Sequence, residues 1–397
     1  MNNFNFHVTT DIRFGKDRLG ELPEALAQFG KKVLLVYGGG SIKKNGLYDR
    51  VTTLLSEQGF DMWELAGVEP NPRVQTVKRG ADLCKEHGID VVLPIGGGST
   101  IDCGKAVAAF ALSGMDDPWE LVLGRRGYTG PALPIVTILT LAATGSEMNV
   151  GAVISNPETK QKLGFGGPSM LPSVSFLDPT NTFSVNHYQT AAGSADILSH
   201  LMENYFSRVT GVDVQNRITE GLMRATIANM RIALKTPADY DARANLMWAS
   251  TLALNGLTGA GKGGAWSCHP MEHELSAFYD ITHGVGLAIL TPRWMAHVLN
   301  EETVFQFATY AREVWGITET VPELAAKMGI QKLYDFFKEC QIPMTLPEVG
   351  IKDERDFEAM AQQAIDHSSI ATAAFVPLQK ADVLAIYQAC MTESQFV

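Results

Sequence analysis

The sequence has only five cysteines in 397 residues, and they lie far apart. Cys84, Cys103, Cys268, Cys340 and Cys390 contain no Cys-x-x-Cys pair, so neither a disulfide framework nor a zinc ribbon is indicated. An odd number of widely spaced thiols is typical of a protein kept in a reducing compartment. We therefore expect a cytoplasmic location.

Long apolar runs and a basic surplus are also lacking. The longest apolar stretches, near residues 33–37 and 135–143, have the length of a strand and are too short to cross a bilayer. The opening MNNFNFHVTT has no basic region followed by an apolar one, so no signal peptide is expected. With 43 acidic and 32 basic residues the net charge is −11, which disfavours nucleic acid and membranes as partners. Chemistry on a small molecule remains the expected class of activity.

The composition is that of a folded chain that is too long for one ordinary core. The hydrophobic content is 46%, and no Ser, Gln or Pro tract indicates a disordered scaffold. A chain of this length is expected to form two domains. The sequence pattern changes after Pro179, so we place the division at 1–180 and 181–397.

The first part predicts an α/β domain. Its β-rich runs alternate with amphipathic stretches, the pattern of a parallel sheet covered by helices. The expected strands are 31–37, 90–95 and 134–141, and the expected helices are 47–59 and 100–111. The second part predicts an all-α domain, because helical periodicity dominates it. Its expected helices are 190–209, 213–235, 240–256, 293–314 and 322–340.

Two glycine clusters lie where a strand gives way to a helix, at residues 38–41 (GGGS) and 96–99 (GGGS). Bare backbone N–H groups at such places can hold phosphate oxygens. Lys43 and Ile101 stand where the third glycine of a GxGxxG fingerprint would fall, so the ordinary Rossmann motif is not met. A tight turn that needs positive φ would explain one cluster, whereas two clusters on neighbouring strand ends favour a dinucleotide.

Histidines gather in the predicted helical part. Asp196 and His200 lie four residues apart within a helical stretch and so share a face, as do His269 and His273, and His283 follows. Buried imidazoles need partners, and this region is otherwise rich in apolar residues. The pattern predicts a metal site.

The donor types indicate which ion this site would hold. One carboxylate and three imidazoles suit Zn²⁺ or Fe²⁺ with an open position for a substrate oxygen, and they disfavour Ca²⁺ and Mg²⁺. Cys268, the neighbour of His269, is expected to belong to the core.

Taken together, these motifs resemble those of the metal-dependent, so-called iron-containing, alcohol dehydrogenases over essentially the whole chain. The resemblance depends on residues 96–99 with Asp102, on the segment TLAATGSE at 140–147, on Asp196-x₃-His200, and on His269-x₃-His273-x₉-His283 followed by Gly284. The opening segment, YGGGSIKK at 37–44 and residues 69–72 are similar to the branch of NADPH-dependent aldehyde reductases and butanol-type dehydrogenases.

The resemblance implies a Rossmann-like domain followed by an all-helical one, a dehydroquinate synthase-like architecture, and a homodimer. It implies the metal ligands Asp196, His200, His269 and His283, with His273 as a non-ligand that faces the nicotinamide and the substrate. Residues implied to line the dinucleotide are Asn71, Gly97, Gly98, Ser99, Asp102, Thr140, Thr144, Asn149 and Lys162.

The activity implied is the interconversion of aldehydes and primary alcohols by hydride transfer. Coordination of an alcohol oxygen to a divalent ion lowers its pKa, and the resulting alkoxide can transfer hydride to the nicotinamide. His273 is the expected catalytic proton relay.

The sequence predicts NADP(H) as the preferred cofactor over NAD(H). Dehydrogenases that prefer NAD carry a carboxylate after an early strand, which binds the ribose hydroxyls and repels a 2′-phosphate. Here the strand 31–37 leads into Gly38, Gly39, Gly40 and Ser41, and no acidic residue follows before Asp49. The backbone N–H groups of the three glycines, the Ser41 hydroxyl and the ammonium groups of Lys43 and Lys44 are all suited to bind the phosphate.

Two other activities share parts of this pattern. A dehydroquinate synthase-like lyase also uses NAD and a metal, but it needs several basic side chains for its substrate, and only Lys262 lies near the histidine segment. A nucleotide-binding sensor without catalysis would be indicated by an incomplete ligand set, and the set is complete.

Overall fold

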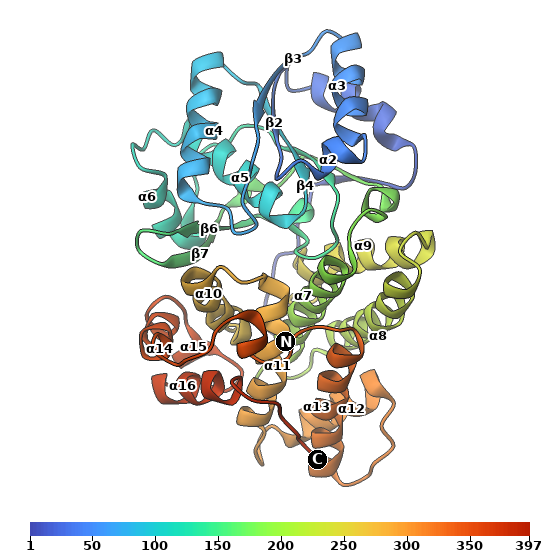
Figure 1. Ribbon diagram of the computed structural model, residues 1–397, viewed down its shortest axis with the longest axis vertical. Coiled ribbons are helices and arrows are strands. Elements are labelled where there is room, and N and C mark those ends of the chain that lie inside the picture. Colours follow the sequence, from blue (N-terminus) through green and yellow to red (C-terminus); the bar gives the residue numbers. More distant parts are fainter. The chain divides into compact units, whose positions relative to one another are not determined.

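The structure is a computed structural model that describes residues 1–397, the side chain of Arg126 apart. The chain divides into two units (Figure 1). The sheet unit contains residues 7–185 and 237–255, and the helical unit contains residues 1–6, 186–236 and 256–397. The predicted combination of a parallel-sheet α/β domain with an all-α domain is confirmed.

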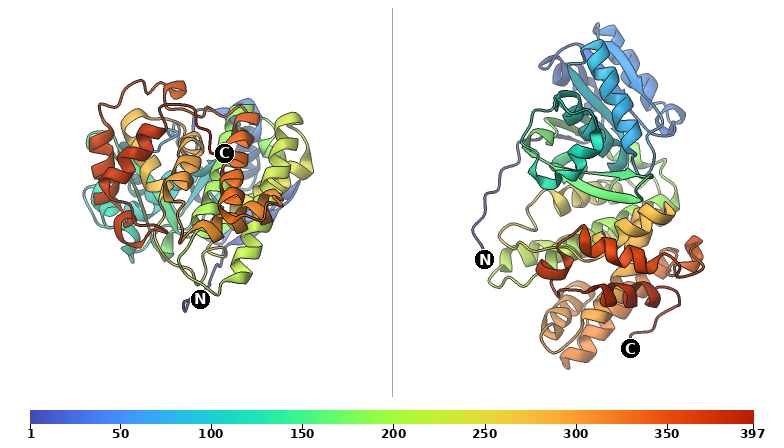
Figure 2. Two further views of the ribbon diagram at one scale, coloured as in Figure 1. Left: turned by 90° about the horizontal axis from the view of Figure 1, so that it is seen from below. Right: turned by 90° about the vertical axis from the view of Figure 1, so that its left-hand side faces the viewer.

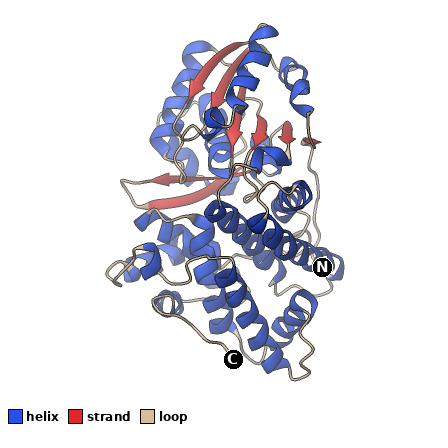
Figure 3. Ribbon diagram, turned by 45° about the vertical axis from the view of Figure 1, so that its right-hand side comes forward, coloured by secondary structure: helices blue, strands red, loops and turns tan.

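The centre of the sheet unit is a six-stranded parallel sheet with the order β1-β8-β5-β4-β2-β3. Its strands, red in Figure 3, are β1 (Asp11–Phe14), β2 (Lys32–Val36), β3 (Asp61–Leu65), β4 (Val91–Gly96), β5 (Val136–Leu139) and β8 (Val174–Leu177). A separate antiparallel pair is formed by β6 (Gly151–Asn156) and β7 (Gln161–Gly166).

Helices cover both faces of this sheet. The α-helices of the sheet unit are α1 (Leu22–Ala27), α2 (Ser41–Lys44), α3 (Leu47–Glu57), α4 (Val74–His87), α5 (Gly98–Leu112), α6 (Pro118–Leu123) and α9 (Tyr240–Leu254). Leu34 and Val36 of β2 pack with α4 and α5, whereas Val33 and Leu35 pack with α1 and α3. Figure 1 shows α4 and α5 on one side of β2 and α3 on the other. Burial on both faces explains why the residues of β2 form a continuous apolar run and do not alternate between apolar and polar.

The helical unit contains nine α-helices in the described part of the chain. They are α7 (His187–Tyr205), α8 (Asp213–Lys235), α10 (Cys268–Tyr279), α11 (His283–Val298), α12 (Val304–Trp315), α13 (Pro322–Glu339), α14 (Phe357–Asp366), α15 (Ile370–Ala373) and α16 (Lys380–Ala389). Figure 2 shows the later helices of this unit in yellow to red. None of the described helices is both long enough and apolar enough to span a membrane.

The structure corrects one predicted helix and adds elements that were not predicted. The stretch 293–314 is interrupted, because Asn300 Oδ1 accepts from the Glu302 and Thr303 amides and Thr303 Oγ1 accepts from the Asn300 amide. Such local bonds compete with the helix and end α11 before α12 begins. Strand β3 and the β6–β7 pair were not predicted. The residues of β3 form only a weak strand pattern, because β3 is a partly exposed edge strand.

The compact units also differ from a single division at residue 180. Helix α9 packs with the sheet unit, and Met1–Phe6 packs with the helical unit. Thr251 of α9 donates a hydrogen bond to buried Glu147 over 2.5 Å, and Gly145 lies so close to α9 that a Cβ there would be 2.8 Å from the Ser250 carbonyl oxygen. These long-range contacts have no local sequence signal.

Candidate functional site

Helix α7 presents three chemically important side chains on one buried face. Asp196, His200 and Glu203 follow one another at spacings of four and three residues, which keeps them aligned along the helix. All three are buried, and Asp196 is 2% exposed. A cluster of this polarity in a helix interior needs partners from neighbouring elements.

Helices α10 and α11 bring three histidines to this face. His269 lies in the first turn of α10, His273 one turn later, and His283 is the first residue of α11. The Nε2 atoms of His200, His269 and His283 lie 3.6, 3.7 and 3.7 Å from a single oxygen, Oδ1 of Asp196. The structure therefore brings together the donor atoms of all four predicted ligands.

These distances fit one divalent ion. A tetrahedral ion with bonds of about 2.1 Å keeps its ligand atoms about 3.4 Å apart, close to the three distances from Asp196 Oδ1 to the imidazoles. Oδ1 of Asp196 and Nε2 of His269 are buried and have no hydrogen-bond partner in the structure, although such atoms are costly to leave unsatisfied. A cation among the four donors would satisfy both atoms.

The electrostatics of this cluster also favour a cation. Burial alone would raise the pKa of Asp196, but the three imidazoles lower it below its usual range. Burial alone would lower the pKa of His269, but the carboxylates of Asp196 and Glu203 raise it to about 9. The cluster thus keeps a negative carboxylate and stabilises positive charge beside it, which a proton on His269 supplies without metal and a divalent ion supplies in its place.

Two buried glutamates that were not predicted orient the imidazoles. His269 donates from Nδ1 to Glu203 Oε1 over 3.2 Å, and Glu203 also accepts the His269 and Ser267 amides over 2.9 and 2.8 Å. His283 donates from Nδ1 to Glu272. A carboxylate on the remote nitrogen leaves Nε2 as the donor atom and raises its basicity.

The role of Glu272 gives a first prediction. Glu272→Gln should preserve the size of the side chain and weaken metal binding about tenfold, since a carboxylate on a ligand histidine contributes a factor of 10 to 100. Metal affinity is measured by competition with a chelator. Glu274→Gln is the matched control, because Glu274 is equally buried in α10 but lies beside His367. Equal effects of both substitutions would contradict the assignment.

His273 and Trp266 border the four donors without joining them. The His273 ring centre is 6.4 Å from that of His269 and 5.7 Å from that of His283. The Trp266 ring lies 5.6 Å from His200 and 4.6 Å from His269, so the indole covers one side of two predicted ligands. His273, His283 and Glu272 form a second close group beside Asp196, His200 and His269, and the 3.7 Å from His283 Nε2 to Asp196 Oδ1 joins the two groups.

The glycine after His283 is explained by close packing of α11 on α7. A Cβ at Gly284 would lie 2.0 Å from the Ala192 carbonyl oxygen, a distance that no side chain can occupy. Because α7 carries Asp196 and α11 begins with His283, this close approach fixes the distance between the two donors. Cys268 is buried, as expected of a core residue.

The first glycine cluster follows strand β2 and precedes α2. Gly40 has φ of +93°, so one member of the predicted turn requires glycine for its conformation. Gly38 and Gly39 have room beside them: a Cβ at Gly38 would make only ordinary contacts, 3.4 Å from the Val68 carbonyl oxygen. Ser41 and Lys44 are both exposed, so their polar groups are accessible to a ligand.

The second cluster requires glycine for space. A Cβ at Gly98 would lie 2.2 Å from Thr144 Oγ1, so these two predicted cofactor residues lie side by side. Ser99 donates to the Pro70 carbonyl oxygen, which places the loop containing Asn71 next to the start of α5. The Thr140 amide donates to the Gly96 carbonyl oxygen over 3.0 Å. The structure thus gathers these predicted residues at the carboxyl ends of β4 and β5.

Other predicted cofactor residues have their side chains engaged within the unit. Asp102 accepts from Ser146 Oγ over 2.5 Å and from the Val153 amide over 2.9 Å, and Asn149 Oδ1 accepts from the Gly151 amide over 2.9 Å. These bonds hold the segment after β5 in place. Lys162 is buried in β7.

A buried lysine that was not predicted supports the same segment. Lys105 is 0% exposed, and its ammonium donates to the Asn149 carbonyl oxygen over 2.7 Å, to Asn149 Oδ1 over 3.1 Å and to the Gly151 carbonyl oxygen over 2.9 Å. Burial lowers the pKa of Lys105 to about 8. Its position three residues after Asp102 in an apolar helix is the only sequence signal for it.

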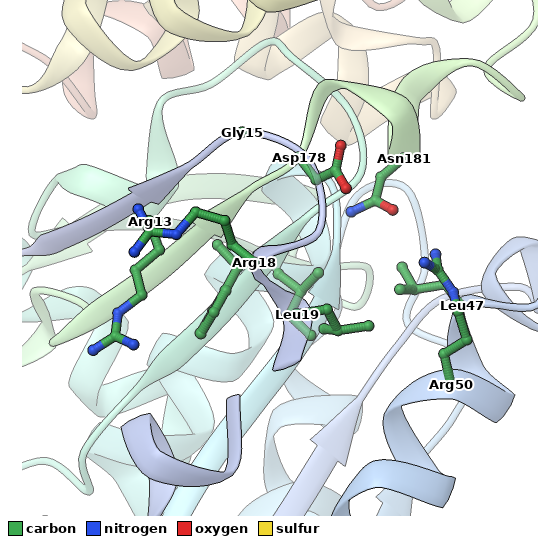
Figure 4. Close-up of a pocket in the computed structure, with 10 residues that line it drawn as sticks. Arg13, Gly15, Arg18, Leu19, Leu47, Arg50, Asp178 and Asn181 are labelled. Carbon is green, nitrogen blue, oxygen red and sulfur yellow. The ribbon is translucent and has the colours of Figure 1, made fainter. Parts of the chain in front are cut away.

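A shallow hollow with about 280 Å³ of empty space, the solvent at its mouth included, lies in another part of the sheet unit (Figure 4). Its lining includes Arg13, Arg18, Arg50 and Asp178 and none of the predicted site residues. Arg13 binds Asp11 over 3.0 Å and Glu21 over 2.8 Å, and Arg18 binds Glu21 over 2.6 Å, so two carboxylates compensate these two guanidinium charges.

Comparisons with known proteins agree with these features. The family model "Iron-containing alcohol dehydrogenase" matches residues 9–179, and "Fe-containing alcohol dehydrogenase family, C-terminal" matches residues 190–391. NADH-dependent butanol dehydrogenase A of Clostridium acetobutylicum is 50% identical over 98% of this chain and 99% of its own length. NADPH-dependent aldehyde reductase YqhD of Escherichia coli is 36% identical over 92% of this chain and 94% of its own.

A solved structure extends the agreement to the fold. The crystal structure of NADH-dependent butanol dehydrogenase A from Thermotoga maritima superposes with a TM-score of 0.93, at 38% identity over 99% of both chains. Both parts of this chain are thus matched by the family models, and its relatives are matched nearly end to end. The chain therefore belongs to the iron-containing alcohol dehydrogenase family and is an aldehyde and alcohol oxidoreductase with a divalent metal and a nicotinamide cofactor.

Proposed function

We propose that this enzyme interconverts aldehydes and primary alcohols with NADP(H) as its preferred cofactor, and that Asp196, His200, His269 and His283 bind the metal. The observation that carries the metal assignment is the convergence of three Nε2 atoms on one oxygen of Asp196. The donor set suits Fe²⁺ or Zn²⁺. Such an ion supplies Lewis-acid polarisation of a carbonyl or hydroxyl oxygen.

The protein's own side chains have separate tasks in this proposal. Glu203 and Glu272 orient two imidazoles and keep their outer nitrogens protonated. Trp266 excludes water from one side of His200 and His269. His273, half-buried beside His283, is placed to exchange a proton with the oxygen of the substrate.

The cofactor preference is argued from the turn at residues 38–41. Gly38, Gly39 and Gly40 carry no carboxylate, while the backbone, the Ser41 hydroxyl and the exposed Lys44 ammonium offer donors to a phosphate. The relatives differ on this point by name: two butanol dehydrogenases of Clostridium acetobutylicum are called NADH-dependent, and YqhD is called NADPH-dependent. Cofactor preference therefore has to be measured for this chain.

Gly38→Asp tests the preference directly. The substitution should raise KM for NADPH at least about tenfold and change KM for NADH by less than about threefold, because a carboxylate repels the 2′-phosphate. The backbone accepts a side chain at this position, since a Cβ at Gly38 would make only ordinary contacts. Gly38→Asn, of equal size and without charge, is the control. If both variants raise the two KM values alike, the ribose does not lie at this turn.

The activity itself is tested with the unmodified protein. Purification without added metal followed by elemental analysis should find one Fe or Zn per chain, and absorbance of the reduced nicotinamide should fall on addition of short aldehydes. Equal kinetic efficiency with NADPH and NADH would refute the proposed preference. Absence of turnover with every aldehyde tested would refute the proposed substrate class.

The lyase alternative receives no support from the basic residue that it needs. Lys262 is 2% exposed, and its ammonium donates to the Asn204 carbonyl oxygen over 2.7 Å. Burial lowers the pKa of Lys262 to about 8. A buried side chain that binds a backbone carbonyl serves the packing of the helical unit and is poorly suited to a charged substrate.

A further inference from the structure

A carboxylate lies beside the glycine turn, although none follows strand β2 in the sequence. Glu64 is in β3, which pairs with β2 so that Leu35 lies opposite Glu64. The two segments remain together beyond the strands, where the Gly67 amide donates to the Gly38 carbonyl oxygen over 3.3 Å. The side chain of Glu64 therefore enters the surroundings of the turn from the neighbouring strand.

Four side chains form what we call the Glu64 cluster: Tyr37, Lys43, Tyr48 and Glu64. Each tyrosine donates its hydroxyl to one carboxylate oxygen of Glu64, Tyr48 over 2.5 Å. The phenol of Tyr48 is protonated at neutral pH, and this bond raises its pKa further, to about 12. The carboxylate is thus held in place with its negative charge intact.

Lys43 belongs to the same cluster through its ammonium. Its Nζ lies 3.7 Å from Glu64 Oε2 and 4.3 and 5.0 Å from the ring centres of Tyr48 and Tyr37. The Lys43 side chain is 48% exposed and that of Glu64 is 39% exposed, so solvent screens their interaction and leaves both accessible. The lysine nearest to the turn is therefore paired with a carboxylate already.

We propose that Glu64 is a specificity-determining residue that weakens binding of the 2′-phosphate of NADP(H), through its own charge and by holding Lys43. The inference rests on the proposed position of the adenosine ribose at residues 38–41. The uncharged 2′-hydroxyl of NAD(H) is affected little by either charge. Preference for NADPH is then a balance between the carboxylate-free turn and the carboxylate of the adjacent strand, and the balance can differ between relatives.

Direct binding isolates this effect from catalysis. Adenosine 2′,5′-bisphosphate and AMP are titrated calorimetrically into unmodified protein and into Glu64→Gln, alongside NADPH and NADH. Glu64→Gln should tighten binding of the bisphosphate and NADPH about three- to tenfold, as expected for loss of one partly screened charge near a phosphate. Binding of AMP and NADH should change by less than about twofold, since neither carries a 2′-phosphate.

Three variants separate charge from architecture. Asp61→Asn removes a carboxylate at the other end of β3. It should change the affinity neither for the bisphosphate and NADPH nor for AMP and NADH. Tyr48→Phe removes one hydrogen bond, keeps all charges and should leave the selectivity nearly unchanged. Lys43→Met should weaken binding of the bisphosphate more than binding of AMP. In a protein that already carries Lys43→Met, Glu64→Gln should have a smaller effect on bisphosphate binding than in the unmodified protein. Because Lys43 is exposed, its variant tests the inference even if Glu64→Gln folds poorly.

The outcomes distinguish this inference from the proposed preference. If Glu64→Gln changes AMP and bisphosphate binding equally, or changes neither, Glu64 does not determine specificity. If the unmodified enzyme prefers NADH but Glu64→Gln still shifts selectivity toward the 2′-phosphate, the proposed preference fails and the role of Glu64 stands. If the unmodified enzyme prefers NADPH and Glu64→Gln shows no shift in selectivity, the proposed preference stands and the role of Glu64 fails.

Discussion

His200→Ala is expected to lower metal affinity so far that the ion is lost on gel filtration and, with it, about a thousandfold or more of kcat/KM, because the metal polarises the substrate oxygen. His200 comes from the same helix as Asp196, and its Nε2 lies 3.6 Å from Asp196 Oδ1. The His200 side chain is buried, so a solvent molecule does not readily replace its Nε2 as a metal ligand. Elemental analysis after gel filtration, together with turnover of an aldehyde, measures both losses.

The control for this experiment is another histidine of the helical unit. His297 lies in α11, the helix that begins with His283, but its Nε2 faces Asp382 over 3.1 Å. His297→Ala should retain metal and activity, and circular dichroism should show both variants folded. A His200→Ala protein with stoichiometric metal and full turnover would exclude His200 as a ligand.

The sequence spacing predicts a metal site in this region but does not by itself identify its ligands. Asp196 and His200 lie one helical turn apart, as do His269 and His273, so helix geometry aligns each pair. The choice of His283 in place of His273 as a ligand comes from the family resemblance. Glu203 and Glu272 could not be identified in this way. Glutamates are common in helices, and the role of Glu272 appears only when α10 and α11 are packed so that His283 Nδ1 reaches it.

Contacts between segments distant in the sequence account for most of what was not predicted. Glu64 lies 26 residues after Gly38 and comes close to the turn only because β3 pairs with β2. The sequence of β3 is itself only a weak strand pattern. Helix α9 has ordinary helical periodicity, but its attachment to the sheet unit depends on Thr251 and the close approach of Gly145. Strand β2 was predictable, since complete burial leaves a continuous apolar run.

The glycine clusters were recognised correctly as strand-to-helix turns, but their glycines serve different purposes. Gly40 needs its left-handed conformation, as a tight turn would predict. Gly98 is needed because Thr144 leaves no space for a Cβ. That requirement depends on the position of the segment after β5, which Asp102 and Lys105 fix through bonds to residues more than forty positions away. No pattern within the cluster could reveal it.

The role of His273 gives the second large expected effect. His273→Ala should keep stoichiometric metal and lower kcat about a hundredfold, the lower range for loss of a general acid or base. The reason is positional: His273 shares a face of α10 with His269 but is absent from the group around Asp196 Oδ1. KM for the cofactor should change little, because the imidazole is proposed to act on the substrate's oxygen.

Two measurements decide between a proton relay and a ligand at this position. His273, His283 and Glu272 form a close group of their own, so metal content must be determined on the same samples as kcat. Loss of metal from His273→Ala would make His273 a ligand and put the tetrad around Asp196 in question. Retained metal with unchanged kcat would leave His273 a packing residue. Retained metal, a reduced kcat and partial recovery on addition of free imidazole would establish proton transfer, because a diffusible base can replace a relay but cannot replace a missing contact in the core.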